Sequence, residues 1–406
     1  MTFGAIAGAK PRPDFAALLV AIACALAIVP TAMFLAALPW LPHMAASRDF
    51  IVYWSTGREL VHHANPYDPA AMGWLEHSTG FRVQGSYFMR SLPWGLWLAW
   101  PLGFFSPRAA TLPWSLGLLA LLILAVRQMA KDGVGMEARW LGYCFPPALL
   151  CVVNGQVSLL ALVGLVFFLR LARSRPFCAG AALALCTLKP HLLLPFAAAL
   201  LAWVLVTRAY RIVAGLAAAL AAGCLLTELA DPAAWTQYLH WLRHSGISAE
   251  FIPCLSVEFR NLINPHTGWL AFVPGAAGCA WAVGFFWRRR NAWDWARDGS
   301  LLVLVSLLVS PYCWVYDQCL ALPALFCAVA RNPSRRIIAT LAALCILIDV
   351  QTLFRFWEAS PAYLWIAPAW LAWYLMARRE SPAANETATV TNSVSWHEPA
   401  AAQGGR

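Results

Sequence analysis

The sequence predicts an all-α protein that crosses a membrane many times, and three observations lead to this fold class. Hydrophobic residues make up 61% of the 406 residues and charged residues only 12%, which is less than half of the charged share of a soluble domain. Apolar runs near the length of a membrane-crossing helix recur along the chain. Lys and Arg residues concentrate in alternate loops between these runs, as the positive-inside rule describes. A soluble fold is excluded.

About twelve apolar runs are long enough, or nearly long enough, to cross. They lie at about residues 15–41, 112–127, 140–153, 157–170, 176–188, 191–206, 211–230, 267–287, 299–310, 318–330, 337–354 and 361–377. Several are shorter than the roughly 20 residues of a straight crossing, so some segments are expected to be broken helices. We therefore expect about 12 transmembrane helices in a single membrane domain at 1–380.

The basic residues predict the orientation of the chain. With a cytoplasmic N-terminus, and with the apolar stretch 92–105 not crossing, most later Arg residues fall inside. If 92–105 crossed, every later loop would change sides, so we expect it to be a helix lying at the outer interface. Both termini are then cytoplasmic, and the two long loops at 42–111 and 231–266 lie outside. The tail 381–406 has no apolar periodicity and is predicted to be disordered.

Charge and cysteine content exclude further classes. The net charge of +10 suits an anionic inner leaflet, and no basic block resembles a nucleic-acid arm, so we predict no nucleic-acid binding. Most of the twelve cysteines lie in apolar runs without metal-ligand spacing, and no outer carboxylate cluster has such spacing either. We therefore predict no metal and no cofactor. Cys254 and Cys313 lie near the outer face, and the sequence leaves open whether they are bonded.

Both outer loops are expected to carry juxtamembrane helices. Ser47 can cap a helix that Asn65-Pro66 ends, because the residue before proline disfavours helical geometry. In the second loop Asp231-Pro232 is a good cap and first-turn pair. An apolar stripe for an interfacial helix follows it at Trp235, Tyr238, Leu239 and Leu242.

The helix of the first outer loop presents a polar face. Asp49, Tyr53 and Thr56 share this face at i, i+4 and i+7. Asp49 would lie in the first turn, where the chain leaves the membrane and the helix dipole is positive. It is either a functional carboxylate or a helix-start residue paired with Arg48, and the isolated sequence favours neither.

Three polar turns are predicted at the outer ends of the spans. They are Asn154-Gly155-Gln156, Lys189-Pro190-His191 and the segment from Ser310 to Gln318. Turn chemistry alone favours a simple hairpin for the first of them. Lys189 is the only lysine predicted outside, and ionisable residues at membrane depth are functional candidates by default.

These residues resemble the pattern of glycosyltransferase family 87. Asp49 through Tyr53 to Asn65-Pro66-Tyr67-Asp68 resembles the first periplasmic loop of that family. The resemblance continues in order through Arg90, Pro93, Pro101-Leu102, Pro107, Ala109, Trp114, Asn154-Gly155-Gln156, Leu188-Lys189-Pro190, Ser310-Pro311-Tyr312 and Tyr316-Asp317. The match runs from about 15 to 377, and its specificity comes from the ordered set. Many members have a histidine after the tryptophan of the last motif, where this chain has Tyr316-Asp317.

The resemblance implies an integral-membrane enzyme of the GT-C class, in the inner membrane of a bacterium, with its active site at the periplasmic surface. It implies a polyprenyl-phosphate sugar donor, typically of mannose, and inversion at the anomeric carbon. The acceptor would be a lipid or a glycan. The resemblance also implies that Asp49 is the general base.

One base is chemically sufficient, because a lipid phosphate leaves without a general acid. Lys189 is the first choice to hold that phosphate, and aromatic residues such as Tyr53, Tyr67 and Trp314 either stack on the sugar or pack at the interface. The predicted substrate-binding residues are Lys189, Tyr53, Tyr67, Asp68, Arg90, Asn154, Gln156, His191, Arg260, Tyr312, Tyr316 and Asp317.

Two other classes compete with the enzyme. A transporter or flippase for a lipid-linked sugar or another amphiphile also has many spans and broken helices. Against it, Asp349 is the only acidic residue well inside a span, and no internal repeat is evident. The third possibility is a scaffold protein, but a scaffold would give no reason for polar groups from separate segments to converge on the outer side.

Overall fold

The computed structural model describes residues 25–380 except 27, 30, 34, 48, 82–88, 245–251 and 356–359. Every regular element in this part of the chain is a helix, so the all-α prediction is confirmed. About half of the first apolar run, including its start, and the whole tail 381–406 lie outside the described residues.

The helices follow one another in this order, with 3-10 helices written as η. They are η1 (Leu38–Ser47), α2 (Phe50–Val61), α3 (Pro69–Ser78), η2 (Pro93–Leu98), η3 (Trp100–Phe104), α4 (Pro107–Met129), η4 (Ala130–Asp132), α5 (Met136–Tyr143), α6 (Pro146–Asn154), α7 (Ser158–Leu171), α8 (Pro176–Cys186), η5 (Pro190–Leu193), α9 (Leu194–Thr207), α10 (Tyr210–Ala230), α11 (Ala234–His244), α12 (Leu255–Ile263), η6 (Gly268–Phe272), α13 (Val273–Arg289), η7 (Arg290–Ala292), α14 (Asp298–Leu308), η8 (Val315–Ala321), α15 (Leu322–Arg331), α16 (Arg335–Arg355), η9 (Pro361–Tyr363) and α17 (Ile366–Arg379).

Five of the described helical segments are long and apolar enough to cross a membrane. They are Pro107–Met129, Pro190–Thr207, Tyr210–Ala230, Gly268–Ala292 and Arg335–Phe354. The apolar helices α7, α8 and α14 are shorter, at 10–17 residues. The chain is therefore an all-α membrane protein, but the described residues do not provide twelve straight crossings.

The run at 140–153 illustrates why an apolar run and a helix differ. It divides into α5 and α6, which are separated by Cys144 and Phe145. Phe145 has extended backbone angles (φ −65°, ψ 113°), because the ring of Pro146 disfavours helical geometry in the residue before it. One apolar run thus becomes two short helices.

The stretch 92–105 forms η2 and η3, short 3-10 helices that are too short to cross. The two elements pack against α10 and α2 respectively. Trp54 Nε1 on α2 donates to Phe105 O at 2.9 Å and Arg58 Nη1 donates to Gly103 O at 3.1 Å. Gly57 and Gly103 lie at the point where the two backbones approach most closely, and a Cβ on either would overlap the other segment. The stretch therefore forms part of the layer that supports α2.

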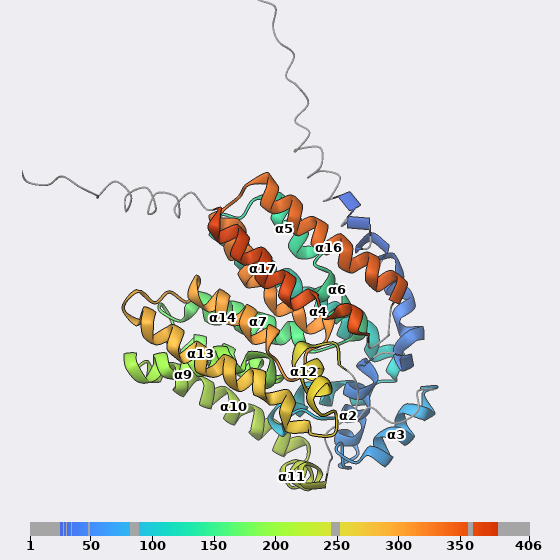
Figure 1. The fold of residues 1–406 in the computed structure, drawn as a ribbon. Coiled ribbons are helices and arrows are strands. Elements are labelled where there is room, and N and C mark those ends of the chain that lie inside the picture. The colour runs from blue at the N-terminus through green and yellow to red at the C-terminus, as the bar shows by residue number, and fades with distance from the viewer. Residues whose placement is uncertain are drawn as a thin grey trace, which may run out of the picture.

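The connecting helices gather at one end of the bundle. Figure 1 shows α2 and α3 at the lower right, α12 beside α2 and α11 at the bottom, while α9, α10 and α13 extend from them toward the left. The core is divided in the same way, with one large apolar cluster inside the bundle and a smaller one around α2. The long loops thus fold into a cap over one end of the helices.

The second long loop contributes α11 and α12 to this cap. Asp231 Oδ1 accepts a hydrogen bond from Ala233 N at 2.9 Å just before α11, which fits its predicted role as a helix-start residue. Leu262 on α12 is 78% exposed, whereas Ser256 on the same helix is buried and donates to Val309 O at 2.9 Å. α12 therefore faces outward with apolar residues and inward with polar ones, as suits a helix at a membrane interface.

Candidate active site

Asp49 stands at the start of α2 as its N-cap residue, but its side chain makes no capping hydrogen bond. The prediction that Ser47 caps this helix is wrong, since Ser47 ends η1. The helix also ends at Val61, earlier than the predicted Asn65-Pro66, and Asn65 Oδ1 instead accepts from Tyr67 N at 2.9 Å in a turn. Arg48, the other predicted partner of Asp49, lies outside the described residues. The Asp49 carboxylate is thus not used to hold its own helix.

A hydrogen-bonded chain links Asp49 to Tyr53 through Gln156. Gln156 Nε2 donates to Asp49 Oδ2 at 2.7 Å, and Tyr53 Oη donates to Gln156 Oε1 at 3.0 Å. The two bonds agree on which end of the amide is oxygen, so the Gln156 side chain has one orientation. The predicted face of Asp49 and Tyr53 therefore exists, and its purpose is to hold this amide against the carboxylate.

The turn that carries Gln156 is shaped to reach α2. Gly155 has φ +76°, and a Cβ on it would lie 2.7 Å from Phe50 Cβ, so glycine is required on both counts. Trp114 Nε1 donates to Gly155 O at 2.8 Å and fixes the turn from α4. The turn is a hairpin, and its close contact with Phe50 brings Gln156 to Asp49. Asn154, the last residue of α6, is buried beside it.

Lys189 and Asp317 form a buried ion pair, with Lys189 Nζ 2.7 Å from Asp317 Oδ1. Asp317 is held by the Ser158 hydroxyl and by Trp314 N, which donates to Oδ2 at 3.0 Å. Burial lowers the pKa of Lys189, but the adjacent Asp317 carboxylate outweighs this effect and raises the pKa above its usual value. Lys189 is thus protonated, and the residue chosen to hold the phosphate is accompanied by a buried carboxylate.

Burial and the neighbouring groups shift the pKa of Asp49 in opposite directions. Burial raises the pKa of Asp49, while the hydrogen bond from Gln156, the charge of Lys189 and a hydrogen bond with Tyr316 lower it. The negative charge of Asp317 acts in the opposite direction. The net result is a carboxyl group with a raised pKa, which makes the ionised form a better proton acceptor than an ordinary aspartate.

Aromatic rings border this pair. Lys189 Nζ lies 4.9 Å from the centroid of the Tyr316 ring. The rings of Trp314 and Tyr316 stack with centroids 6.3 Å apart, and Trp314 Nε1 donates to Tyr312 Oη at 3.0 Å. The His191 ring meets Tyr312 edge to face at 5.3 Å. Tyr312, Trp314 and Tyr316 are half-buried, so parts of their rings remain accessible beside the ion pair.

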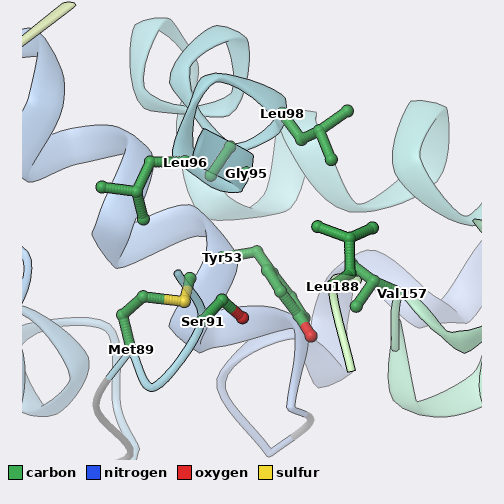
Figure 2. Close-up of a pocket in the computed structure, with 9 residues that line it drawn as sticks. Tyr53, Met89, Ser91, Gly95, Leu96, Leu98, Val157 and Leu188 are labelled. Carbon is green, nitrogen blue, oxygen red and sulfur yellow. The ribbon is translucent and has the colours of Figure 1, made fainter. Parts of the chain in front are cut away.

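Tyr53 belongs to the wall of the site. Figure 2 shows its ring beside Met89, Ser91 and Leu96 on one hand and Val157 and Leu188 on the other. The cavity left there is only about 10 Å³, close to the space of one water molecule. The ring is 9% exposed. Stacking of Tyr53 on a sugar is therefore not supported, whereas its hydroxyl reaches Gln156.

Tyr67 and Asp68 do not join the site. Tyr67 is 1% exposed, donates from Oη to Ser91 O at 2.8 Å and packs against Tyr238 of α11. Asp68 is the N-cap of α3 and accepts from Ala70 N at 2.8 Å. Both predicted binding residues are thus occupied in building the cap, because a hydroxyl and a carboxylate that make these bonds are not directed at a ligand.

The two predicted arginines differ in burial. Arg90 is exposed, and its charge acts on Tyr312. Arg260 is only 5% exposed, on the inward face of α12. Its guanidinium contacts Asn261 Oδ1 at 3.2 Å and has no carboxylate within 4.0 Å among the described residues.

Sequence reasoning missed Ser158 and underrated Trp114. Ser158 is the first residue of α7, two positions after Gln156, and its hydroxyl reaches Asp317. A polar residue at the start of an otherwise apolar run was the available signal. Within the described part of the chain, no three His, Cys, Asp or Glu residues are grouped as a metal site. Cys254 and Cys313 are both free thiols.

Comparisons with known proteins give one match. A sequence model of glycosyltransferase family 87 matches residues 93–311, more than half of the chain. The matched segment contains Gln156, Ser158 and Lys189, while Asp49 and Asp317 flank it. No curated protein and no solved structure matches significantly. The chain belongs to glycosyltransferase family 87, and it is a membrane-embedded transferase of sugars.

Proposed function

We propose that this glycosyltransferase moves a hexose, with mannose the expected sugar, from a polyprenyl-phosphate donor to a lipid or glycan acceptor, with inversion. The transfer takes place at the outer face of the membrane. The observation that carries the proposal is the arrangement of Asp49. One carboxylate oxygen is held by Gln156 at 2.7 Å, and a buried, protonated Lys189 is close enough to act on its charge.

The reaction needs one proton acceptor. The acceptor hydroxyl oxygen forms a bond to the anomeric carbon while the bond from that carbon to the phosphate oxygen breaks. The bonding electron pair leaves with the polyprenyl phosphate, and the hydroxyl proton passes to Asp49 Oδ1. Gln156 donates to Oδ2 and Tyr316 also bonds to the carboxylate, so the proposal assigns the acceptor to Oδ1, the oxygen that Gln156 does not hold. A general base in this position contributes on the order of 10²- to 10⁴-fold to the rate.

The phosphate requires donors and positive charge. Lys189 has three N–H donors, of which Asp317 takes one in the described structure. Asp317 therefore orients the ammonium group and leaves two of its N–H donors for the phosphate. Arg260 supplies a second buried cation, on the helix that docks at Val309. Together they would hold the phosphate and stabilise the negative charge that develops as it leaves.

The sugar is expected to lie against the aromatic rings of η8 and the turn before it. Trp314 and Tyr316 present half-buried, stacked rings next to Lys189. Tyr53 and Tyr67, in contrast, are enclosed by the protein on all sides. The donor phosphate at Lys189 and the ring at Trp314 would place the anomeric carbon between these residues and Asp49.

A transfer assay with purified full-length protein tests the proposal. The protein is incubated with radiolabelled mannosyl-phosphoryl-polyprenol and a membrane extract, and lipid and glycan products are separated. We expect labelled product with inverted anomeric configuration. Transfer from a nucleotide sugar, but not from the polyprenyl donor, would contradict the donor class. Movement of the labelled donor across vesicles without any product would favour a flippase instead.

A further inference from the structure

A second cavity lies at the other end of the bundle from Asp49. Its volume is about 470 Å³, which is within the range of about 300–1,000 Å³ of small-molecule sites. It is lined by residues of α7, α14 and α15, by the end of α4 and by the loops before α5 and α14; among them are Val134, Val166, Arg170, Phe326, Ala330 and Arg331. α7 connects the two sites, since Ser158 at its first residue reaches Asp317 and Arg170 near its last lines the cavity. Its 14 residues span about 20 Å.

The wall of this cavity is apolar. Val134, Val166 and Phe326 are each at most 4% exposed, and they belong to three different segments. Ser300 does not change this character, because its hydroxyl is already bonded to Ala296 O at 2.6 Å. A hydrophobic group would be covered on several sides here.

The rim, in contrast, carries two cations. Arg170 Nη1 donates to the backbone oxygen of Gln128 at 2.7 Å, which holds the guanidinium at the edge of the cavity. Arg331 lines the same cavity, and its side chain is 39% exposed. Its nearest carboxylate, Asp294, is 4.0 Å away and 42% exposed, and such a surface pair is weak. Arg331 can therefore turn to a stronger anion.

We propose that this cavity binds an anionic phospholipid, with the phosphate between Arg170 and Arg331 and the start of the acyl chains against Val134, Val166 and Phe326. Charge and shape together select this ligand. A free anion would not need the apolar wall, and a neutral lipid would not need the arginines. Basic pockets between transmembrane helices are known to suit anionic head groups. The site is separate from the transfer chemistry and does not depend on Asp49.

Native mass spectrometry of the full-length protein in detergent tests the proposal, with phosphatidylglycerol as the probe and phosphatidylcholine as the neutral comparison. The double variant Arg170→Gln/Arg331→Gln should bind phosphatidylglycerol at least about tenfold more weakly, because each arginine near the membrane surface contributes to the attraction. The matched control is Arg211→Gln/Arg379→Gln, which removes the same charge at two exposed positions outside the cavity. The control should bind like the parent.

A second variant tests the cavity without removing any charge, and its result does not depend on whether the double variant folds. Ala330→Phe places a ring in the cavity and leaves both arginines in place, so it should also weaken binding. Three results would overturn the proposal. They are equal binding by the pocket variants and the control, equal binding of phosphatidylcholine, and displacement of the lipid by millimolar inorganic phosphate, which would make the cavity a site for free anions.

Discussion

At the residue scale, the account depends on how Asp49 is oriented and charged. Gln156 is a positioning residue, since its amide touches Asp49 and Tyr53. Lys189 and Asp317 form the neighbouring ion pair. Together with the hydrogen bond between Asp49 and Tyr316, these three contacts orient the Asp49 carboxylate and set its charge. Two predictions belong to this scale.

The first prediction concerns the pH dependence of kcat. Asp49 must be ionised to accept a proton, and burial raises its pKa, so activity should be lost as the pH falls through a value above the usual ~3.9 of aspartate. Gln156→Leu removes a hydrogen bond that favours the ionised form. The pKa of Asp49 should therefore rise further, and the acidic limb of the pH profile of kcat should move to higher pH. In addition, kcat should be lower by at least about tenfold, because the base is misplaced.

The control for this variant is Gln128→Leu, at the far end of α4, where the side chain accepts a hydrogen bond from the exposed Lys131. It should keep the parent profile. An unchanged acidic limb in Gln156→Leu, measured on protein that folds normally, would show that the amide does not act on Asp49.

The second prediction separates binding from folding at Lys189. Lys189→Met should raise the KM for the donor because a phosphate ligand is lost. It should also destabilise the protein by about 3–5 kcal/mol, the usual cost of leaving a buried carboxylate without its partner. The double variant Lys189→Met/Asp317→Asn removes the unpaired charge as well. Its thermal stability should recover in part while the donor KM stays high. A donor KM equal to that of the parent in either variant would remove Lys189 from the phosphate site.

At the element scale, the decisive feature is the turn between α6 and α7. Gly155→Ala should lower stability by about 1–3 kcal/mol, because alanine is strained at a left-handed residue and its Cβ would meet Phe50 at 2.7 Å. Because the turn carries Gln156, transfer activity should fall too.

Gly284→Ala is the control: this helical position on α13 has open space around it, and alanine there should be neutral or stabilising by up to ~1 kcal/mol. Thermal melts in detergent compare the two variants with the parent. Equal melting temperatures of Gly155→Ala and Gly284→Ala would show that the turn is not tightly fitted.

The elements also show what the sequence could and could not predict. Apolar runs located the long helices well, since α4, α10 and α16 coincide with runs at 112–127, 211–230 and 337–354. Backbone rules around proline explain the break at Phe145, but they did not locate the end of α2, which stops before Asn65-Pro66. Local propensity sets a limit to a helix, and tertiary packing decides how much of it forms.

For the site, residue chemistry alone singled out Lys189, because ionisable residues at membrane depth are few. Asp49 and Gln156 became candidates through the family resemblance, since the residues by themselves left Asp49 open and favoured a simple hairpin at Gln156. Tyr67 and Asp68 were included because Asn65-Pro66-Tyr67-Asp68 resembles the first loop of the family, and the structure places Tyr67 against α11 and Asp68 at the start of α3. The pairing of Lys189 with Asp317 spans 128 positions and depends on tertiary structure that no local pattern encodes.

At the scale of the whole molecule, the predicted orientation is open to a direct test. Ser78 at the end of α3 belongs to the same cap as α2, and Lys131 lies beyond the far end of α4; both are exposed. In a background without other reactive thiols, Ser78→Cys should react with an impermeant maleimide added outside intact cells, and Lys131→Cys should react only after lysis. The reverse pattern would place Asp49 on the cytoplasmic side and contradict transfer at the outer face.

The measurement that tests the central claim most directly is the turnover of Asp49→Asn. Asparagine keeps the shape and a hydrogen-bonding group but cannot take the acceptor proton, so kcat should fall by at least about a hundredfold with little change in donor KM. Asp68→Asn is the matched carboxylate control: it weakens the start of α3 and should keep turnover within a few-fold of the parent. If Asp49→Asn, folded like the parent, transferred sugar at a near-normal rate, Asp49 would not be the base and the proposed mechanism would be wrong.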